Sequence, residues 1–233
     1  MYLRMPFDPA GSQPLKVVIL IFLVLYGRPL LACNNLNGGG KIVIGAFSNS
    51  SLDNWQPVEF HQRTDYQITH LNGANVLRAY SHHAASGLIY RQRIDLHKTP
   101  LLHWRWRVEK PLFNESEQTR RGDDFAARLY VVVDGGLFFW KTRALNYVWT
   151  SHVPTGHLWK NPYAGKAGMM LAVRSNTDTN NRWVAETRNV YEDLKRAFGH
   201  QIRYIDAIAV MTDTDNTSGT ALTYYGDICF SSH

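Results

Sequence analysis

Apolar and polar residues alternate along most of the chain in short runs that end at turns rich in Gly, Asn, Asp and Ser. Alternation with a period of two places successive side chains on opposite faces of a β-strand. Short strands at this spacing are typical of a β-sandwich or barrel. The runs that predict strands are 41–47, 66–71, 75–81, 85–95, 101–108, 125–134, 145–151, 169–174, 183–190, 202–212 and 220–230.

Helical periodicity occurs at one place. Tyr191, Leu194 and Phe198 share one face of a helix, and Gly199 follows as a stop signal. The pattern therefore predicts one short helix at 191–198 within an all-β protein.

Mid-strand charges recur opposite the apolar faces. One face of the strand at 102–108 carries Leu102, Trp104, Trp106 and Val108, and the other carries His103, Arg105 and Arg107. The apolar face of 125–133 lies opposite Arg128, and Glu186 and Arg188 share a face of 183–190. We expect these charges to gather on one sheet surface, while tryptophans and aliphatics fill the space between two sheets.

The beginning of the chain predicts export. Residues 17–26 are an uninterrupted apolar run, preceded by Arg4 and Lys16, of the length of a signal-peptide core and too short to span a bilayer. The predicted organisation is a signal peptide at 1–32, a flexible Asn/Gly-rich tether at 33–40 and a single β-sandwich domain at 41–233.

The chain has two cysteines, Cys33 and Cys229. The run Leu30-Leu31-Ala32-Cys33 is typical of a bacterial lipoprotein cleavage site, so Cys33 is the predicted lipidation residue. The alternatives are that Cys33 is spare or forms half of a single bridge, and two cysteines exclude a disulfide framework. The predicted location is the periplasm, or a tether to the outer membrane, of a bacterium.

The net charge of +6 is a mild excess, with basic and acidic residues interleaved. The clustered basic footprint of a nucleic-acid-binding protein is missing. We therefore expect no nucleic-acid partner, and membrane contact only through the signal peptide or a lipid on Cys33.

Polar and aromatic side chains on the middle strands form a candidate ligand-binding surface. Guanidinium forks and carboxylates hydrogen-bond sugar hydroxyls, uronates or phosphates, and Tyr147 or Trp149 would stack on a pyranose. The alternative is a solvated face with cross-strand ion pairs. The candidates are Arg105, Arg107, Arg128, Asn146, Tyr147, Trp149, Glu186, Arg188, Asp213, Asp215 and Asn216.

The turn between the last two strands carries Asp213, Asp215 and Asn216. It lacks the glycine and distal glutamate of an EF-hand loop. A structural calcium held by Asp213, Asp215 and the remote Asp227 is one interpretation, and carboxylates that shape the turn by accepting backbone N–H groups are the other. We expect no other cofactor.

Catalytic motifs are missing from the sequence: there is no G-x-S-x-G elbow, P-loop or H-E-x-x-H. Glycoside hydrolysis needs two carboxyl groups across the scissile bond. Glu186 with Asp124 or Asp213 is the alternative pair, if the fold brings them together.

An ordered set of motifs resembles an uncharacterised bacterial family, the domain of unknown function numbered 3047. The segments that carry the resemblance are WRWRV at 104–108, GDDFAARLYV at 122–131, RALNYVW at 143–149, WVAETRNV at 183–190, IAVMTDTDN at 208–216 and YGDI at 225–228. It implies an exported, single-domain protein with no assigned reaction.

A looser resemblance, at the two ends of the chain, is to galactose-binding-like jelly rolls among carbohydrate-binding modules. Phe47, Trp55 and the closing Y-x-D-I-x-F segment carry it. Many such modules hold a calcium between an acidic residue near the first strand and an Asp of the last. Asp227 matches the latter, but Ser48 stands where the glutamate is expected, so the resemblance does not supply a full ligand set.

Together these patterns predict an antiparallel β-sandwich of jelly-roll type that acts as an exported, non-catalytic binding module. The expected ligand is a glycan or another polyhydroxylated or anionic molecule of the cell envelope. One alternative is a hydrolase or lyase acting on envelope polysaccharide. Another is a structural envelope protein that binds another protein.

Overall fold

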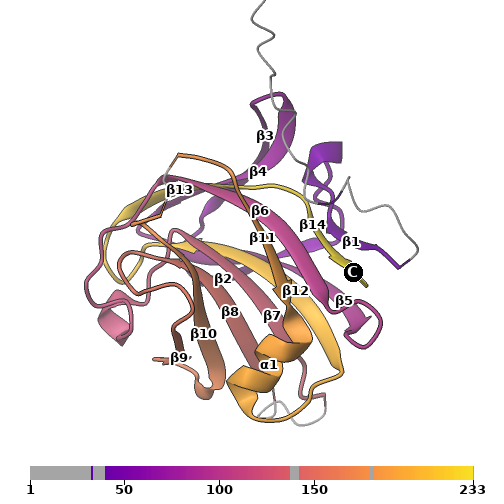
Figure 1. The fold of residues 1–233 in the computed structure, drawn as a ribbon. Coiled ribbons are helices and arrows are strands. Elements are labelled where there is room, and N and C mark those ends of the chain that lie inside the picture. The colour runs from indigo at the N-terminus through magenta and orange to yellow at the C-terminus, as the bar shows by residue number, and fades with distance from the viewer. Residues whose placement is uncertain (1–32, 34–39, 137–141, 179–180, 233) are drawn as a thin grey trace, which may run out of the picture.

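The computed structural model describes residue 33 and residues 40–136, 142–178 and 181–232. These residues form two β-sheets packed face to face, with one helix against their common edge (Figure 1). The predicted all-β sandwich is confirmed. The signal peptide predicted at 1–32, and all of the predicted tether except Cys33 and Gly40, lie outside the described residues.

Sheet A contains seven strands in the order β1-β14-β6-β13-β4-β3, with β11 paired to the free side of β6. β13 and β14 lie end to end along β6, since β13 pairs with its second half and β14 with its first. The strands are β1 (Ile42–Gly45), β3 (Asp65–Leu71), β4 (Ala74–His82), β6 (Leu101–Lys110), β11 (Val184–Asn189), β13 (Thr220–Tyr225) and β14 (Ile228–Ser231).

Sheet B has the order β2-β5-β12-β7-β8-β10-β9. The strand pairs within the described residues are antiparallel, as predicted, except that β8 and β10 are parallel. A parallel pair needs a connection that brings the chain back to the end where the first strand starts. β9 and the loop before it make this connection between β8 and β10. The strands are β2 (Trp55–His61), β5 (Ala85–Asp95), β7 (Ala127–Val133), β8 (Arg143–Thr150), β9 (Leu158–Asn161), β10 (Gly165–Ser175) and β12 (Tyr204–Asp213).

β4 and β6 belong to sheet A and β5 and β7 to sheet B, so the chain crosses between the sheets at each of these steps. It crosses again from β12 in sheet B to β13 in sheet A, as in a jelly roll. Two short 3-10 turns lie at Phe47–Asn49 and Arg120–Gly122. The predicted helix is α1 (Val190–Phe198). Its N-terminus is capped by the Asn189 side chain, which accepts from Glu192 N, and it ends at Gly199 with φ of 78°.

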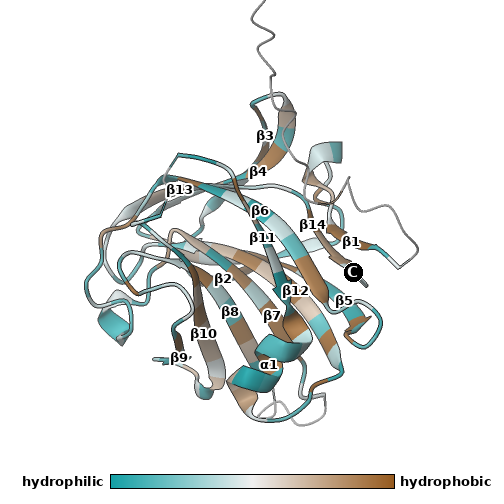
Figure 2. Ribbon diagram, in the orientation of Figure 1, coloured by the Kyte–Doolittle hydropathy of each residue, from teal (hydrophilic) through white to brown (hydrophobic). Residues whose placement is uncertain are grey.

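The core fills the space between the sheets with the faces that the alternation predicted. Leu102, Trp104, Trp106 and Val108 of β6 are fully buried there. The Trp104 ring stacks on Tyr147 of sheet B, with centroids 5.4 Å apart. In Figure 2 apolar and polar residues alternate along the strands of both sheets, so each sheet turns one face to the core and the other outward.

A disulfide joins Cys33 to Cys229 of β14, with the two Cα atoms 5.9 Å apart. A sulfur in a disulfide cannot also form the thioether of a lipidated cysteine, so the lipidation prediction is wrong for this structure. The bridge fixes the chain just before β1 to the strand beside it.

No helix within the described part of the chain has the length and apolar character needed to cross a membrane.

Candidate functional site: a pocket on the outer face of sheet B

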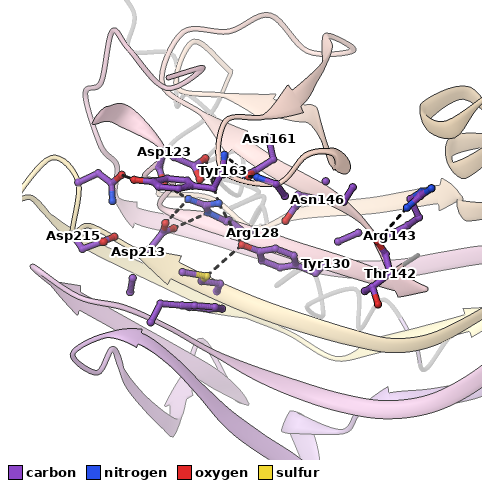
Figure 3. Close-up of a pocket in the computed structure, with 18 residues that line it drawn as sticks. Asp123, Arg128, Tyr130, Thr142, Arg143, Asn146, Asn161, Tyr163, Asp213 and Asp215 are labelled. Atoms are coloured by element: carbon purple, nitrogen blue, oxygen red, sulfur yellow. Dashed lines mark hydrogen bonds and ion pairs between the residues drawn. The ribbon is translucent and has the colours of Figure 1, made fainter. Parts of the chain in front are cut away.

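A pocket of about 610 Å³ opens on the outer face of sheet B. This volume lies within the range of small-molecule sites. Figure 3 shows Asp213 and Asp215 toward one end of the pocket and Thr142 and Arg143 toward the other. Its lining residues are Phe60, Ala85, Asp123, Arg128, Tyr130, Thr142, Arg143, Ala144, Asn146, Asn161, Tyr163, Ala164, Ala167, Gly168, Met211, Asp213, Asp215 and Asn216.

Strand alternation places the lining side chains. Leu129 and Val131 of β7 point into the core, so Arg128 and Tyr130, which alternate with them along the strand, point outward. The neighbouring strands β8 and β12 contribute Asn146 and Met211 in the same way, each paired in register with β7. The pocket floor is therefore built on rigid strands.

Arg128 organises the inner end of the pocket and is only 2% exposed. Its Nε donates to Asp213 Oδ1 over 2.7 Å, and one terminal nitrogen donates to Asp213 Oδ2 and to the Asp123 carbonyl oxygen. The other terminal nitrogen donates to the Tyr130 hydroxyl over 3.3 Å and lies 3.5 Å from Asp123 Oδ1. The N–H donors of the guanidinium group are thus used in hydrogen bonds and ion pairs within the protein.

This pairing explains the protonation of the cluster. Burial alone would lower the pKa of Arg128, but attraction by Asp123 and Asp213 outweighs it and raises that pKa well above its usual value. Burial raises the pKa of the Asp123 carboxyl, and Arg128 opposes the shift only in part. The cluster keeps its arginine charged.

Asp124 holds the turn after β12 in place. Its Oδ1 accepts from Asn216 N over 3.1 Å, and its Oδ2 accepts from the Thr217 N and Oγ1, each over 2.6 Å. The turn-shaping role was predicted for Asp213 and Asp215, whereas Asp124 is the carboxylate that accepts from Asn216 N and Thr217 N.

Asp215 lies in that turn at the pocket rim and is partly exposed. Burial raises the pKa of Asp215, and the neighbouring Asp124 carboxylate raises it further. Carboxyl oxygens of Asp124, Asp213 and Asp215 lie within 4.8 Å of one another. One end of the pocket is therefore acidic.

Asn146 presents an acceptor to the pocket floor. Its Nδ2 donates to the Met169 carbonyl oxygen over 3.1 Å, which fixes the orientation of the amide, since a carbonyl can only accept. Its Oδ1 is buried and has no hydrogen-bond partner among the described residues. An unpaired buried acceptor costs free energy that a ligand donor would recover.

Two exposed aromatic rings border the pocket: Phe60 is 71% exposed and Tyr163 56%. Asn161 shapes the turn that carries Tyr163, because its Oδ1 accepts from Tyr163 N and Ala164 N. The Tyr163 hydroxyl lies 2.7 Å from Asn216 Oδ1, and Arg120 lies over the ring at 5.4 Å. The ring of Tyr163 is therefore held in place beside the pocket.

The structure brings five of the predicted ligand-binding residues to this pocket. They are Arg128, Asn146, Asp213, Asp215 and Asn216.

Six other candidates lie elsewhere, so the expectation of one shared surface is wrong. Arg105 and Arg107 point outward from β6 of sheet A. Arg105 lies over the Trp183 ring at 4.4 Å, and Arg107 pairs with Glu109.

Tyr147 and Trp149 are buried between the sheets, so they cannot form an aromatic platform. Glu186 and Arg188 share a face, as predicted, but this face points toward the core at the sandwich edge. Glu186 accepts from Trp106 Nε1 and pairs with Arg174, and Arg188 pairs with Asp193 beside the Tyr147 hydroxyl. The register of β11 with β6 sets this direction, since Glu186 pairs with the core residue Trp104.

The alternative catalytic pair is contradicted by the same placement. Glu186 faces the space between the sheets, whereas Asp124 and Asp213 lie at the outer face of sheet B. The three carboxylates do not converge in one cleft.

The predicted calcium ligand set is also wrong in one member. Asp227 accepts from the Ser48 N and Oγ at 2.8 and 2.6 Å, at the start of sheet A, and not from the turn that holds Asp213 and Asp215. Ser48 thus bonds Asp227 directly through its backbone and its side chain. Asp124 takes the third position near Asp213 and Asp215.

Sequence reasoning missed Phe60, Tyr130 and Tyr163 as pocket residues. Tyr130 could have been found, because it lies two residues after Arg128 and so shares its face. Phe60 and Tyr163 reach the pocket from β2 and from a turn, and no periodic signal connects these segments with β7.

A family model described as "Protein of unknown function (DUF3047)" matches residues 53–229. No curated protein matches the chain. The similar solved structures include carbohydrate-binding modules and a hydrolase domain. The glycoside hydrolase domain of Endo-D from Streptococcus pneumoniae is 13% identical with a TM-score of 0.37, and the match covers 77% of this chain and 22% of that chain. The family 30 carbohydrate-binding module of a Clostridium thermocellum cellulosomal cellulase is 8% identical with a TM-score of 0.47, and the match covers 83% of this chain and 98% of that chain. The CBM27-1 module of Caldicellulosiruptor saccharolyticus, in complex with mannohexaose, is 8% identical with a TM-score of 0.42, and the match covers 84% of this chain and 99% of that chain.

All three TM-scores are below 0.5. The function is therefore argued from the pocket and not from these likenesses.

Proposed function

We propose a function from the geometry of the pocket, because the chain belongs to the DUF3047 family, whose description assigns none. In this proposal the protein is a non-catalytic binding module, and the outer face of sheet B holds a hydroxylated glycan. The observation that carries the proposal is the buried, unpaired Oδ1 of Asn146 in a pocket bordered by the exposed rings of Tyr163 and Phe60.

Glycan recognition needs both of these elements. A pyranose has an apolar face that packs on an aromatic ring and a rim of hydroxyls that donate and accept hydrogen bonds. Tyr163 offers a fixed ring, and Asn146 offers an acceptor on the floor. Strand residues position the floor, so little is lost in ordering the site when a ligand binds.

The pocket is poorly suited to the anionic alternative. Arg128 is occupied by Asp123, Asp213 and Tyr130. A carboxylate or phosphate ligand would have to compete with two buried carboxylates for the same guanidinium group. We therefore propose a ligand without negative charge.

The absence of catalysis is also part of the proposal. Asp213 is held by Arg128 and by Phe125 N, and Asp124 by the turn at Asn216. Carboxylates committed to structural hydrogen bonds are poorly placed to move protons across a glycosidic bond.

Export is proposed on two grounds. Residues 17–26 have the composition of a signal-peptide core, and disulfides persist mainly in oxidising compartments. Thiol alkylation and mass measurement of the protein from the periplasmic fraction should find Cys33 and Cys229 protected until a reductant is added. Free thiols in that fraction, or protein retained in the cytoplasm, would contradict this.

The binding proposal is tested by screening the purified protein against an array of neutral oligosaccharides and measuring the best ligand by calorimetry. Tyr163→Ala should weaken binding about tenfold through loss of the stacking ring. Asn146→Leu should weaken it about threefold to tenfold through loss of the acceptor.

Tyr80→Ala is the matched control. Tyr80 is also an exposed tyrosine under an arginine, with Arg78 at 5.2 Å, but it belongs to β4 of sheet A. Its replacement should leave binding unchanged. Loss of binding in Tyr80→Ala, or full binding in both Tyr163→Ala and Asn146→Leu, would show that the glycan does not bind in the pocket of sheet B.

A further inference from the structure

The chemistry of the pocket narrows the ligand class. Three carboxyl residues line the pocket, Asp123, Asp213 and Asp215, against the guanidinium groups of Arg128 and Arg143. The whole chain has the opposite sign, a net charge of +6. The acidic character is thus local to this end of the pocket.

Asp215 is the carboxylate that a ligand can reach. Asp213 and Asp123 are 2% and 6% exposed, and both lie against Arg128, whereas Asp215 is partly exposed at the rim. No lysine or arginine within the described residues forms an ion pair with Asp215; its near neighbours are the carboxyl oxygens of Asp124 and Asp213. A cation placed beside it would relieve like-charge repulsion.

Asn146 points independently to the same kind of ligand. Its buried Oδ1 lacks a donor among the described residues, and its Nδ2 is already used on Met169. The Asn146 amide oxygen and the Asp215 carboxylate are both acceptors. Their complement is a ligand rich in N–H and O–H donors with a positive charge.

Resting on the proposed glycan function, we infer that the pocket prefers an amino sugar with a free ammonium group. The ammonium pairs with Asp215, a hydroxyl donates to Asn146 Oδ1, and the sugar ring packs beside Tyr163. Uronates and other acidic sugars are excluded by the same carboxylates.

The test uses sets of oligosaccharides with one skeleton that differ in one substituent: free amine, N-acetyl, hydroxyl or carboxylate. Glucose and galactose skeletons are both included. Affinities are measured at several pH values from mildly acidic to neutral, because the ion pair needs a protonated amine and an ionised Asp215, whose pKa is raised by burial and by Asp124. Each series is run in low and in high salt. We expect the amine form to bind about tenfold more tightly than its N-acetyl and hydroxyl partners in low salt. The advantage should shrink in high salt, since screening weakens a partly exposed ion pair.

Asp215→Asn should bring the ratio of amine to N-acetyl affinity close to one, and Asp215→Glu should restore part of it. Asp65→Asn is the matched control, because Asp65 is an exposed carboxylate on β3 of sheet A. Its loss should leave the ratio unchanged.

The outcomes separate this inference from the proposed function. Neutral sugars that bind as tightly as their amine partners, or a ratio unaffected by Asp215→Asn, would overturn the amino-sugar preference and leave the glycan function standing. Tightest binding of the carboxylate set would also overturn the preference. No binding of any sugar would overturn both.

A metal at the same place is the remaining outcome. Calcium is titrated alone, without sugar, into the protein and into Asp215→Asn. Calcium binding that Asp215→Asn abolishes would assign Asp124, Asp213 and Asp215 to a cation and overturn the ammonium inference.

Discussion

Each sheet has one buried arginine on its outer face, and the two arginines differ in the hydrogen-bond acceptors around them. Arg128 on sheet B and Arg105 on sheet A are 2% and 3% exposed, and each lies over an aromatic ring, Phe125 at 4.5 Å and Trp183 at 4.4 Å. Arg128 is surrounded by acceptors. Arg105 Nε has no hydrogen-bond partner within the described part of the chain.

As a consequence, their pKa values shift in opposite directions. Burial lowers the pKa of Arg105, with Asp227 opposing, whereas the carboxylates around Arg128 raise its pKa despite its burial. Arg128 holds two acidic segments together and so shapes a pocket. The Arg105 stem packs against Gly226, and its guanidinium group lies over the Trp183 ring. Of these two buried arginines, the one that is paired with carboxylates lines the pocket.

The largest expected effect comes from removing each cation in turn. Arg128→Met leaves Asp123 and Asp213 buried without their partner and should lower the free energy of unfolding by about 3–5 kcal/mol. Arg105→Met keeps the packed stem, loses a cation–π contact and removes a buried charge whose Nε is unpaired, so the loss should be below about 1 kcal/mol. Urea unfolding of both variants checks this contrast, and equal losses would contradict it.

A smaller effect is expected from crowding Arg105. A Cβ at Gly226 would lie 2.4 Å from Arg105 Nε and 2.5 Å from its Cγ, so Gly226→Ala should cost about 1–3 kcal/mol through overpacking. In the double variant with Arg105→Ala the clash is gone. The two changes should therefore be less destabilising together than their sum, as measured by a double-mutant cycle. Simple additivity would show that Arg105 does not fill this space.

The contact between Ser48 and Asp227 tests the other end of sheet A. Ser48→Ala removes the 2.6 Å hydrogen bond to Asp227 Oδ2 and keeps the backbone bond to Oδ1. We expect a loss of about 1–2 kcal/mol, because the acceptor is charged and buried. Ser51→Ala is the control, since its partner Asp53 is exposed. A loss no greater than that of the control would show that the contact is not needed.

The smallest expected effect is on the pH dependence of stability, and it concerns sheet B. The pKa of Asp123 is raised by burial. The unfolded state therefore loses this proton first, and the Asp123 contribution to stability falls as the pH rises from the ordinary carboxyl value through the raised one. Asp123→Asn should remove that fall. The check is the unfolding free energy of the wild type minus that of the variant, measured across the acidic range. This quantity should fall as the pH rises, and a rise would contradict the prediction.

Much of the fold could be predicted from the sequence. Period-two alternation placed Trp104 and Trp106 on the apolar face of one strand and Arg128 on the polar face of another, and burial of the apolar faces then turned Arg128 outward. The helix at 191–198 followed from its face and from Gly199. The parallel pairing of β8 with β10 could not be predicted, since the alternation of apolar and polar residues in β8 is compatible with a parallel or an antiparallel neighbour.

The candidate site was predictable only in part. Alternation tells which residues share a face of one strand but not which face of the sandwich that is. Glu186 shows the limit: it is charged, yet its strand pairs it with Trp104 and turns it inward, where Arg174 and the Trp106 indole satisfy it. Tyr163 and Phe60 come from segments that only tertiary structure brings to β7.

The most direct test of glycan binding in this pocket is a crystal structure of the protein with the tightest-binding oligosaccharide from the array. We expect a sugar ring beside Tyr163, with a donor within hydrogen-bonding distance of Asn146 Oδ1, on the outer face of sheet B. A sugar bound on sheet A beside Trp183 and Arg107, with the pocket around Arg128 unchanged, would contradict it.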